Sequence, residues 1–408
     1  MDPHLLQWTK QLNHWRTSRI SILVPLVVIP LVIVISLFAI AVFQGQSRML
    51  DAEKTQAEEE INRLIHELIT VRSEDQFVRN EQLVKEITNI QTTYDQAVKI
   101  YEELIDLRVL TKDTGKLEEQ LAGSFSLLSQ RKWSTASAQL ATLLKDIRAT
   151  KEKIAASFVI PANVVENNAP PSAGFSRQSV KADIGSYLVD MIAADMSNTR
   201  IIVDTASDGT CLKDCPALSL SEYVSRSGAF AGINGSYFCP ADYPSCADKK
   251  NSFDTLLMNK NKAYFNPDNN VYSTVPAVIF LSGSMRFVGR TLDWGRDTSP
   301  DGVLAMQPLL LSGGNITFGG DDDPKKGSRG NRSFVGNKGS VAYIGVVHSA
   351  TVAEVAHVLK TLGLDNGLNL DNGGSTALWS GGPASPSQGG YKVGPGRNIP
   401  NAILFVKK

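Results

Sequence analysis

The chain has 408 residues, which is room for two or three domains, and its 41 Lys and Arg residues balance 41 Asp and Glu residues. A net charge of zero provides no basic field for phosphate neutralisation, so we expect no nucleic acid among its partners. The hydrophobic fraction of 42% is typical of folded domains and excludes a wholly disordered chain. Of the 32 glycines only Gly45, Gly115 and Gly123 precede residue 160, so two different kinds of structure share the chain.

Residues 20–43 form an uncharged, apolar segment. At about 1.5 Å per residue, a helix of this length crosses a hydrocarbon core of about 30 Å. A cleaved signal peptide is the alternative, but the segment is too long for one and no small-residue cleavage site follows it. Lys10, Arg16 and Arg19 precede the segment, which places residues 1–19 in the cytoplasm and everything after residue 43 outside the membrane. We therefore predict a single-pass cell-membrane protein with a signal-anchor.

Residues 47–158 are predicted to form a helical stalk. One apolar stripe recurs at spacings of four and three residues through Leu83, Ile87, Ile90, Tyr94, Ala97, Tyr101 and Leu104. After a helix stop at residues 112–115, two further stripes follow, Leu117, Leu121, Ser124 and Leu128, and then Ala136, Leu140, Leu143 and Ile147. The pattern predicts two or three antiparallel helices or a short coiled coil. It leaves open whether the stalk is a spacer or a module for homo-oligomerisation or partner docking.

A linker of residues 159–176, rich in Pro and Asn, leads to a Gly-rich domain of residues 177–408. Short apolar runs predict strands at residues 201–203, 278–281, 309–311, 341–347 and 402–406. Helices are predicted at residues 219–227 and 351–362. The fold class is therefore α+β: a strand-rich domain preceded by a transmembrane helix and a helical stalk.

All four cysteines fall in one short window of this domain, at Cys211, Cys215, Cys239 and Cys246. Outside the cytoplasm an even number of cysteines favours disulfides, and three pairings are open. We expect the near-neighbour pairing, 211–215 with 239–246, because each bond then closes a small loop. A zinc site with four thiolates is the alternative, although the spacings differ from two CxxC knuckles.

Four segments of the second domain combine Gly with Asn, Asp or Arg. They are Gly232-Ile233-Asn234-Gly235-Ser236-Tyr237-Phe238, Arg332-Ser333-Phe334-Val335-Gly336, Asn369-Leu370-Asp371-Asn372-Gly373-Gly374-Ser375-Thr376 and Arg397-Asn398-Ile399-Pro400-Asn401-Ala402. In this order, with a predicted helix before the third, they resemble the motifs of the phosphodiester glycosidase family, which includes N-acetylglucosamine-1-phosphodiester α-N-acetylglucosaminidase. The resemblance covers roughly residues 180–408. It implies a hydrolase that cleaves a sugar from a phosphodiester.

The chain departs from the family pattern at four positions. Asn372 stands where the LDGGGS run has Gly, Asn331 and Asn398 stand where the family has Pro, and Ser333 replaces Thr. The Asp, Arg and Asn positions suited to chemistry are kept. The departures therefore bear on substrate and rate more than on fold.

Asp371 and Arg332 are the candidate catalytic residues. A sugar-1-phosphodiester releases a phosphate monoester, a stable anion that needs charge neutralisation more than protonation. Arg332 and Arg397 suit this role because a guanidinium binds phosphate with two hydrogen bonds and stays charged; for each, the structural alternative is an ion pair with a loop carboxylate. Asp371 follows an expected strand and precedes a Gly pair, so its carboxylate is a candidate nucleophile, base or stabiliser of an oxocarbenium-like centre. Capping of its own turn is the alternative.

The candidate substrate-binding residues are Asn234, Gly235, Arg397, Gly373, Gly374, Ser375 and Thr376. Asn-Gly is also a common turn sequence, which is the alternative for the first two. His348 is a further candidate, as a proton carrier, although a lone His is more often structural. The second carboxylate of most glycosidases stays open among Asp204, Asp208, Asp254 and Glu354, and with it the choice between retention and inversion.

No cofactor or catalytic metal is expected. The run Asp321-Asp322-Asp323 raises calcium as an alternative, since hard cations prefer carboxylate oxygens, but the two lysines that follow favour a solvated loop.

Topology and motifs together predict a membrane-anchored hydrolase that cleaves the glycosidic bond of a sugar-1-phosphodiester in an envelope glycan or exopolysaccharide. The alternative is a non-catalytic glycan-binding or envelope-organising protein that works through its stalk, with Asn372 marking a decayed site. A third alternative is hydrolysis of the phosphodiester P–O bond.

Overall fold

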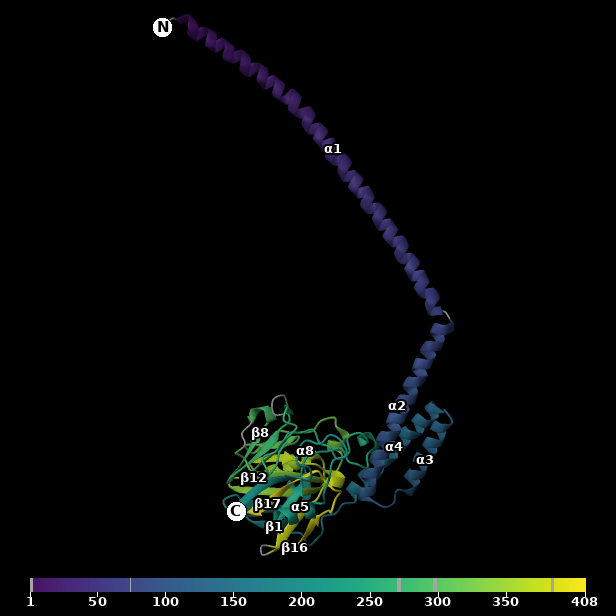
Figure 1. Ribbon diagram of the computed structural model, residues 1–408, viewed down its shortest axis with the longest axis vertical. Helices are drawn as coiled ribbons and strands as arrows, with labels where there is room; N and C mark the ends of the chain where they lie inside the picture. The colour runs from purple at the N-terminus through teal and green to yellow at the C-terminus, as the bar shows by residue number, and fades with distance from the viewer. Residues whose placement is uncertain (1–2, 74, 270–272, 296–298, 383–384) are drawn as a thin grey trace. The chain divides into compact units, whose positions relative to one another are not determined.

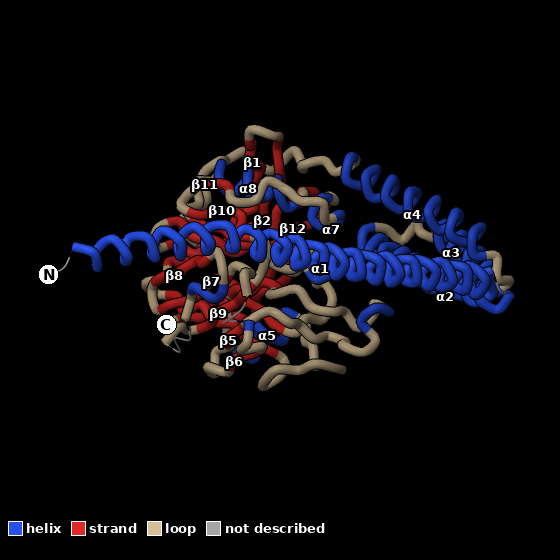
Figure 2. The backbone as a smooth tube through the Cα atoms, turned by 90° about the horizontal axis from the view of Figure 1, so that it is seen from above, coloured by secondary structure: helices blue, strands red, loops and turns tan. Residues whose placement is uncertain are grey.

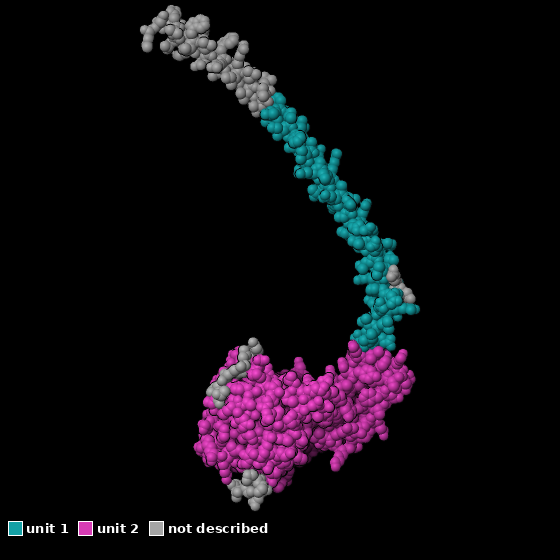
Figure 3. Space-filling model, viewed as in Figure 1, with its two compact units in different colours: residues 1–88 teal, residues 89–408 magenta. Residues whose placement is uncertain are grey.

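The computed structural model describes residues 3–73, 75–269, 273–295, 299–382 and 385–408. Side chains are described from residue 30 onward, apart from residues 74–75, 270–272, 296–298 and 382–388. The chain divides into two compact units, residues 1–88 and residues 89–408, which Figure 3 colours separately.

The first unit consists of helix α1 (Pro3–Ser73) and the beginning of helix α2 (Asp75–Leu110). Within the described residues, one helical span, Pro30–Ser73, is long and apolar enough to cross a membrane. The first ten residues of the predicted segment 20–43 lie outside the part whose side chains are described. The helical state of this region agrees with the prediction of an N-terminal apolar helix.

The second unit begins with a bundle made from the rest of α2, α3 (Gly115–Ser129) and α4 (Trp133–Ala156). Both predicted stripes of α3 and α4 are buried in its core, as are Ala97 and Leu104 of α2. The stripe of α2 is buried only in its C-terminal part, because α3 and α4 are shorter than α2; Leu83, Ile87 and Tyr94 are exposed. Figure 1 shows the three helices beside the strand-rich part of the chain.

The strand-rich part contains seventeen strands among the described residues. They are β1 (Gly174–Ala182), β2 (Gly185–Asp195), β3 (Thr199–Thr205), β4 (Ala231–Asn234), β5 (Leu257–Met258), β6 (Tyr264–Phe265), β7 (Ala277–Leu281), β8 (Ser284–Val288), β9 (Gly302–Ala305), β10 (Leu309–Ser312), β11 (Asn315–Ile316), β12 (Gly330–Lys338), β13 (Val341–Ala350), β14 (Asn366–Asn369), β15 (Leu378–Gly382), β16 (Ser385–Val393) and β17 (Asn401–Lys407). Each of the five predicted strands lies within one of them, namely β3, β7, β10, β13 and β17.

These strands form three antiparallel sheets, in the orders β1-β2-β13-β12-β14-β10-β11, β16-β15-β4-β17-β3 and β6-β5-β9-β7-β8. One apolar core joins all three, with Ile344 from the first sheet, Ile403 from the second and Phe280 from the third fully or almost fully buried. Burial on both faces explains why β13 reads as a nearly continuous apolar run, a pattern also found in buried parallel strands.

Helices α5 (Leu220–Ser227) and α8 (Val352–Thr361) each cover a face of one sheet, and the short α7 (Pro324–Gly327) packs against α8. Helix α8 packs its apolar face on the seven-stranded sheet, and Figure 2 shows it beside β1 and β10. Capping boxes begin α5 at Ser219 and α8 at Thr351, each with a Glu three residues later, so both predicted helices are confirmed.

Two disulfides close short loops in the described structure, Cys211–Cys215 and Cys239–Cys246. The predicted near-neighbour pairing is therefore confirmed, and the alternative of a zinc site with four thiolates is excluded. The second loop contains a short 3-10 turn, η1 (Pro244–Cys246), and lies against helix α2.

Candidate active site

Asp371 follows the end of strand β14, one residue after the fully buried Leu370. The backbone N–H of Asp371 donates to the carbonyl of Gly235 at 2.9 Å. The side-chain amide of Asn234 donates to the carbonyl of Asp371 at 2.6 Å. Residues at the end of strand β4 therefore form hydrogen bonds with both the backbone N–H and the backbone carbonyl of Asp371.

Asn234 connects three of the four motif segments. It is fully buried, and its Oδ1 accepts from the Ser333 hydroxyl at 2.9 Å and from the Ala377 N–H at 3.1 Å. Gly235 is equally confined, because a Cβ there would lie 1.9 Å from Oδ1 of Asn401. The sequence placed both residues among those that bind substrate; in the structure neither lines the cavity described below, and together they fix the position of Asp371.

A cavity of about 1110 Å³ opens in front of Asp371. Ligand sites commonly have volumes of about 300–1,000 Å³, so this cavity holds more than a small monosaccharide. Six of the predicted site residues line it: Asp371, Arg332, Arg397, Gly373, Gly374 and Ser375. Thr376 is buried and does not line it; its hydroxyl donates to the carbonyl of Asn331 at 3.3 Å.

The Asp371 carboxyl group is half-buried, and its pKa is raised from the ordinary value of 3.8 to about 6. Burial is the main cause, because a carboxylate loses hydration in the cavity wall. The Ser375 hydroxyl, the Asn372 N–H and the charge of Arg397 lower the pKa, and the charge of Asp106 raises it. Asp371 therefore changes its protonation state close to neutral pH, as general bases and nucleophiles often do.

Arg332 lies on strand β12, which the sequence analysis did not predict, and it is 6% exposed. Its Nε donates to the carbonyl of Ala350 at 3.0 Å, and its Nη2 donates to the carbonyls of Lys325 and Ser328. Among the described residues none offers Arg332 a carboxylate within ion-pair distance, so the alternative of a structural ion pair finds no support. Burial lowers its pKa, and the charges of Asp323 and Glu354 act in the opposite direction without reversing the shift.

Arg397 reaches the same cavity from the other side of Asp371. Its Nη1 lies 3.4 Å from Asp242, its Nη2 lies 3.6 Å from Asp106, and its guanidinium is 5.3 Å from the centre of the Tyr243 ring. Its backbone N–H donates to the carbonyl of Gly374 at 2.8 Å. A Cβ on Gly374 would lie 2.5 Å from Nη2, so a larger residue there would displace the guanidinium from this position.

Asn372, the main departure from the family motif, has a structural role. Its φ is −130°, an extended conformation open to any residue, so a Gly is not needed there. Its Oδ1 accepts from the Ser333 N–H at 2.9 Å, and its Nδ2 donates to Asn369 at 3.1 Å. Asn372 thus ties the turn to strands β12 and β14.

Tyr237 is a cavity residue to which the sequence assigned no role, although it lies inside the first motif. Its hydroxyl accepts from Nδ2 of Asn369 at 2.9 Å. Burial, and then the charge of Asp371, raise its pKa to about 12, so the hydroxyl keeps its proton and is a hydrogen-bond donor for the cavity.

His348 lies away from the cavity. Its Nε2 is 2.9 Å from Asp190, which also pairs with Arg177, and its ring stacks on Phe158 with centroids 6.1 Å apart. The structure places it in a hydrogen-bonded group with Asp190, the structural alternative for this residue.

The four carboxylates considered as partners of Asp371 also lie outside the cavity lining. Asp204 is buried in ion pairs with Arg226 and Lys260, and Glu354 caps α8; Asp208 and Asp254 are exposed. The other carboxylates that line the cavity are Glu103, Asp106, Glu152 and Asp323. Three of these come from the helical bundle, and the motifs give no signal for them.

The acidic run that suggested calcium is partly neutralised. Lys326 lies 2.5 Å from Asp321 and 3.7 Å from Asp323, and Asp323 caps α7 by accepting from the Lys325 N–H. In the described part of the chain no three His, Cys, Asp or Glu side chains converge as a metal site.

The solved structures that resemble this chain include the following three. A hypothetical protein from Synechocystis has a TM-score of 0.38 and 13% identity over 57% of this chain and 62% of its own. The zebrafish N-acetylglucosamine-1-phosphodiester alpha-N-acetylglucosaminidase catalytic domain, auto-inhibited by its pro-peptide, has a TM-score of 0.42 and 13% identity, over 60% of this chain and 87% of its own. A putative exported protein from Burkholderia pseudomallei K96243 has a TM-score of 0.34 and 11% identity, over 54% and 74%.

No curated protein matches the chain in sequence. The chain spans less than two thirds of the Synechocystis protein. A family match covers the segment that contains all four motifs and the cavity residues of the strand-rich part. Residues 227–406 match the phosphodiester glycosidase family, which confirms over this range the resemblance that the motifs predicted.

Proposed function

We propose that this protein is a membrane-anchored hydrolase that cleaves the glycosidic bond of a sugar-1-phosphodiester outside the cell membrane. One observation carries the proposal: a half-buried carboxylate, Asp371, shares a cavity with Arg332, a buried cation that has no carboxylate partner among the described residues. A buried charge without a partner is unfavourable, so the cavity suits an anionic ligand. The family match over residues 227–406 agrees with this chemistry.

In the proposed reaction the bond between the anomeric carbon and the phosphate oxygen breaks, and its electron pair leaves with the phosphate monoester. Arg332 and Arg397 neutralise the charge that develops on this leaving group. The ionised Asp371 acts at the anomeric carbon in one of two ways. It bonds to the carbon directly, and water then hydrolyses this bond to free the sugar and the carboxylate, or it takes a proton from the water that attacks the carbon. The Ser375 hydroxyl and the Asn372 N–H bind the carboxylate and hold its orientation.

The proposed location rests on three features of the chain. The apolar N-terminal helix is long enough to span a membrane, the Lys and Arg residues before it favour a cytoplasmic N-terminus, and the two disulfides fit an oxidising compartment. At this location the substrate would be an envelope glycan or exopolysaccharide that contains phosphodiester-linked sugars.

The test is to assay the full chain in detergent on a panel of sugar-1-phosphodiesters, with Asp371→Asn and the exposed Asp208→Asn as a matched pair. Free sugar plus a phosphate monoester, lost in Asp371→Asn and retained in Asp208→Asn, is the expected result. Sugar phosphate plus an alcohol would instead show cleavage of the P–O bond and overturn the bond assignment. A folded chain that releases nothing from any donor would favour the glycan-binding alternative.

A further inference from the structure

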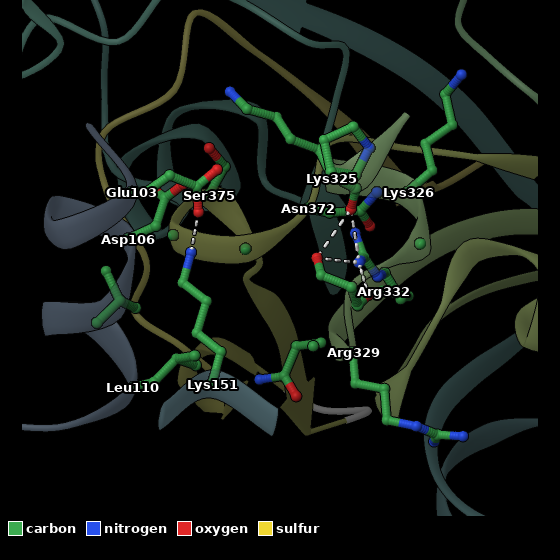
Figure 4. A pocket seen from close by; sticks show the side chains of 18 of the residues that line it. Glu103, Asp106, Leu110, Lys151, Lys325, Lys326, Arg329, Arg332, Asn372 and Ser375 are labelled. Carbon is green, nitrogen blue, oxygen red and sulfur yellow. Dashed lines mark hydrogen bonds and ion pairs between the residues drawn. The ribbon is translucent and has the colours of Figure 1, made fainter. Parts of the chain in front are cut away.

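The cavity has a wall that lies outside the family match. Helix α2 contributes Glu103, Asp106 and Leu110, and helix α4 contributes Arg148 and Lys151. Figure 4 shows Glu103, Asp106 and Lys151 on one side of the cavity and Arg332 on the opposite side. The helical bundle and the strand-rich part belong to one compact unit, so both sides of the cavity are described together.

The disulfide-closed loop 239–246 connects this helical wall to the candidate active site. The Ser245 N–H donates to Glu102 at 3.0 Å, and the Tyr243 hydroxyl donates to Oδ1 of Asp106. On the other side of the bundle the Ser349 hydroxyl donates to the carbonyl of Ala155 at 3.3 Å. The bundle is therefore fixed to the strand-rich part at two places, one of them beside Arg397.

Asp106 is the residue of helix α2 that contacts a candidate phosphate-binding residue, Arg397. Its Oδ1 receives the Tyr243 hydroxyl and also lies 3.6 Å from Nη2 of Arg397. The Tyr243 ring lies 5.3 Å from the same guanidinium, so Asp106 and Tyr243 contact both each other and Arg397. Asp242, 3.4 Å from Nη1, is the other carboxylate beside this arginine. We propose that Asp106 is the second carboxylate of the active site and positions Arg397 for the phosphate group of the substrate.

The other carboxylates of the lining are less suited to this role. Glu103 pairs with Lys151 at 2.5 Å, within the bundle itself. Asp323 caps α7 and pairs with Lys326. Glu152 is exposed on α4 and makes no described contact with an arginine of the site. Asp106 alone among them touches a candidate phosphate-binding residue.

Two physical consequences follow from a carboxylate beside Arg397. It neutralises part of the guanidinium charge, so it weakens the attraction of any anion while it holds the arginine in one orientation. The charge of Asp106 also raises the pKa of Asp371. The other charged or titratable groups around Asp371 in the cavity are Arg397, Tyr237 and Arg332. A residue that only docked the helix would have neither effect.

The test uses the full chain in detergent, with Asp106→Asn, Asp106→Glu and the exposed Asp113→Asn as a charge-matched control in the loop before α3. Inorganic phosphate is the probe, and its dissociation constant is measured by calorimetry. Asp106→Asn should bind phosphate about three- to tenfold more tightly, since one partly screened charge beside Arg397 is removed. In an Arg397→Gln background, Asp106→Asn should have no further effect on phosphate binding.

Turnover gives the second readout. We expect Asp106→Asn to lower kcat about tenfold, because the guanidinium loses its orientation, and to move the midpoint of the pH profile below that of the wild type. Asp106→Glu should restore most of the rate, and Asp113→Asn should match the wild type. Circular dichroism checks that each variant is folded.

Unchanged or weaker phosphate binding in Asp106→Asn would overturn the inference, and so would tighter binding with unchanged turnover. The inference rests on the proposed function, because it takes Arg397 as a phosphate-binding residue. Different results would refute the proposed function and the inference. A wild-type chain that neither binds phosphate nor cleaves any donor refutes the proposed function. An active wild type whose phosphate binding and turnover are unchanged by Asp106→Asn refutes only the role of Asp106.

Discussion

Replacing Asp371 by Asn should abolish turnover and at the same time stabilise the fold at neutral and alkaline pH. The folded state raises the pKa of this carboxyl from 3.8 to about 6, so the folded chain holds the proton more tightly than the unfolded chain does. The stability that this group contributes is fully present below pH 3.8 and is lost as the pH rises through about 6. Above that pH the wild type carries a buried charge that destabilises it.

The size of this effect follows from the shift. About two pKa units at 1.36 kcal/mol each give an upper limit of about 3 kcal/mol, and partial solvent access in the cavity reduces this to about 1–3 kcal/mol. Asparagine keeps an oxygen that accepts from the Asn372 N–H but carries no charge. At about 2–4 °C per kcal/mol for a domain of this size, the variant should melt roughly 2–12 °C above the wild type at pH 8.

The assay is thermal unfolding of the full chain in detergent at several pH values between 4 and 8, with activity measured on the same samples. We expect the difference in Tm to appear above pH 6 and to vanish near pH 4, where the wild-type carboxyl is protonated. Activity should fall about 10²- to 10⁴-fold above pH 6, where the wild-type carboxyl is ionised, and by less near pH 4, where it is protonated. An Asp371→Asn variant that melts at or below the wild-type temperature at pH 8 would refute the reasoning, because the carboxylate would then be stabilising.

Three further predictions concern the surroundings of Asp371. Arg332→Gln should lose most of kcat/KM and also about 1–3 kcal/mol of stability, measured by steady-state kinetics and denaturant unfolding, because three backbone carbonyls lose a charged donor. Gly374→Ala should raise KM several-fold, because the new Cβ displaces the guanidinium packed against this glycine, whereas Gly319→Ala, with open space around it, should leave KM unchanged. Replacing both cysteines of the Cys239–Cys246 bond by serine should lower kcat as well as Tm, whereas the same change at Cys211–Cys215 should lower Tm by a similar amount with kcat unaffected.

The predictable part of the fold follows from local signals. Strand β13 and helix α8 have unbroken apolar patterns and standard caps, and both occur where the sequence predicts them. Strand β12 was missed around Arg332 because Gly, Asn and Arg residues there lack an apolar alternation, and pairing with β13 and β14 supplies the order that propensity does not. The α2 stripe was overextended for the opposite reason: periodicity shows that a helix has an apolar face, and only the length of its partners decides how much of it is covered.

The residues of the candidate site are also only partly predictable from local sequence signals. Asp371, Arg332 and Arg397 are candidates because their motifs resemble those of the family and their side chains suit a phosphodiester, and the fold brings them to one cavity. Asn234 also lies in one of the motifs, yet the hydrogen bonds of its side-chain amide all go to other parts of the chain around the site. A motif therefore identifies the residues that build a site. It does not separate the residues that line the cavity from those that support the backbone behind it, because that difference depends on side-chain burial.

Asp106 has no sequence signal at all, because an acidic residue on the polar side of a helical stripe is ordinarily a solvated charge. Its contact with Arg397 depends on the docking of α2 against the loop closed by Cys239–Cys246, which is a tertiary event. The same docking covers one side of the cavity with helices that lie outside the family match. In the proposed function the bundle of residues 89–158 is therefore part of the catalytic unit, because residues of its helices line the same cavity as Asp371.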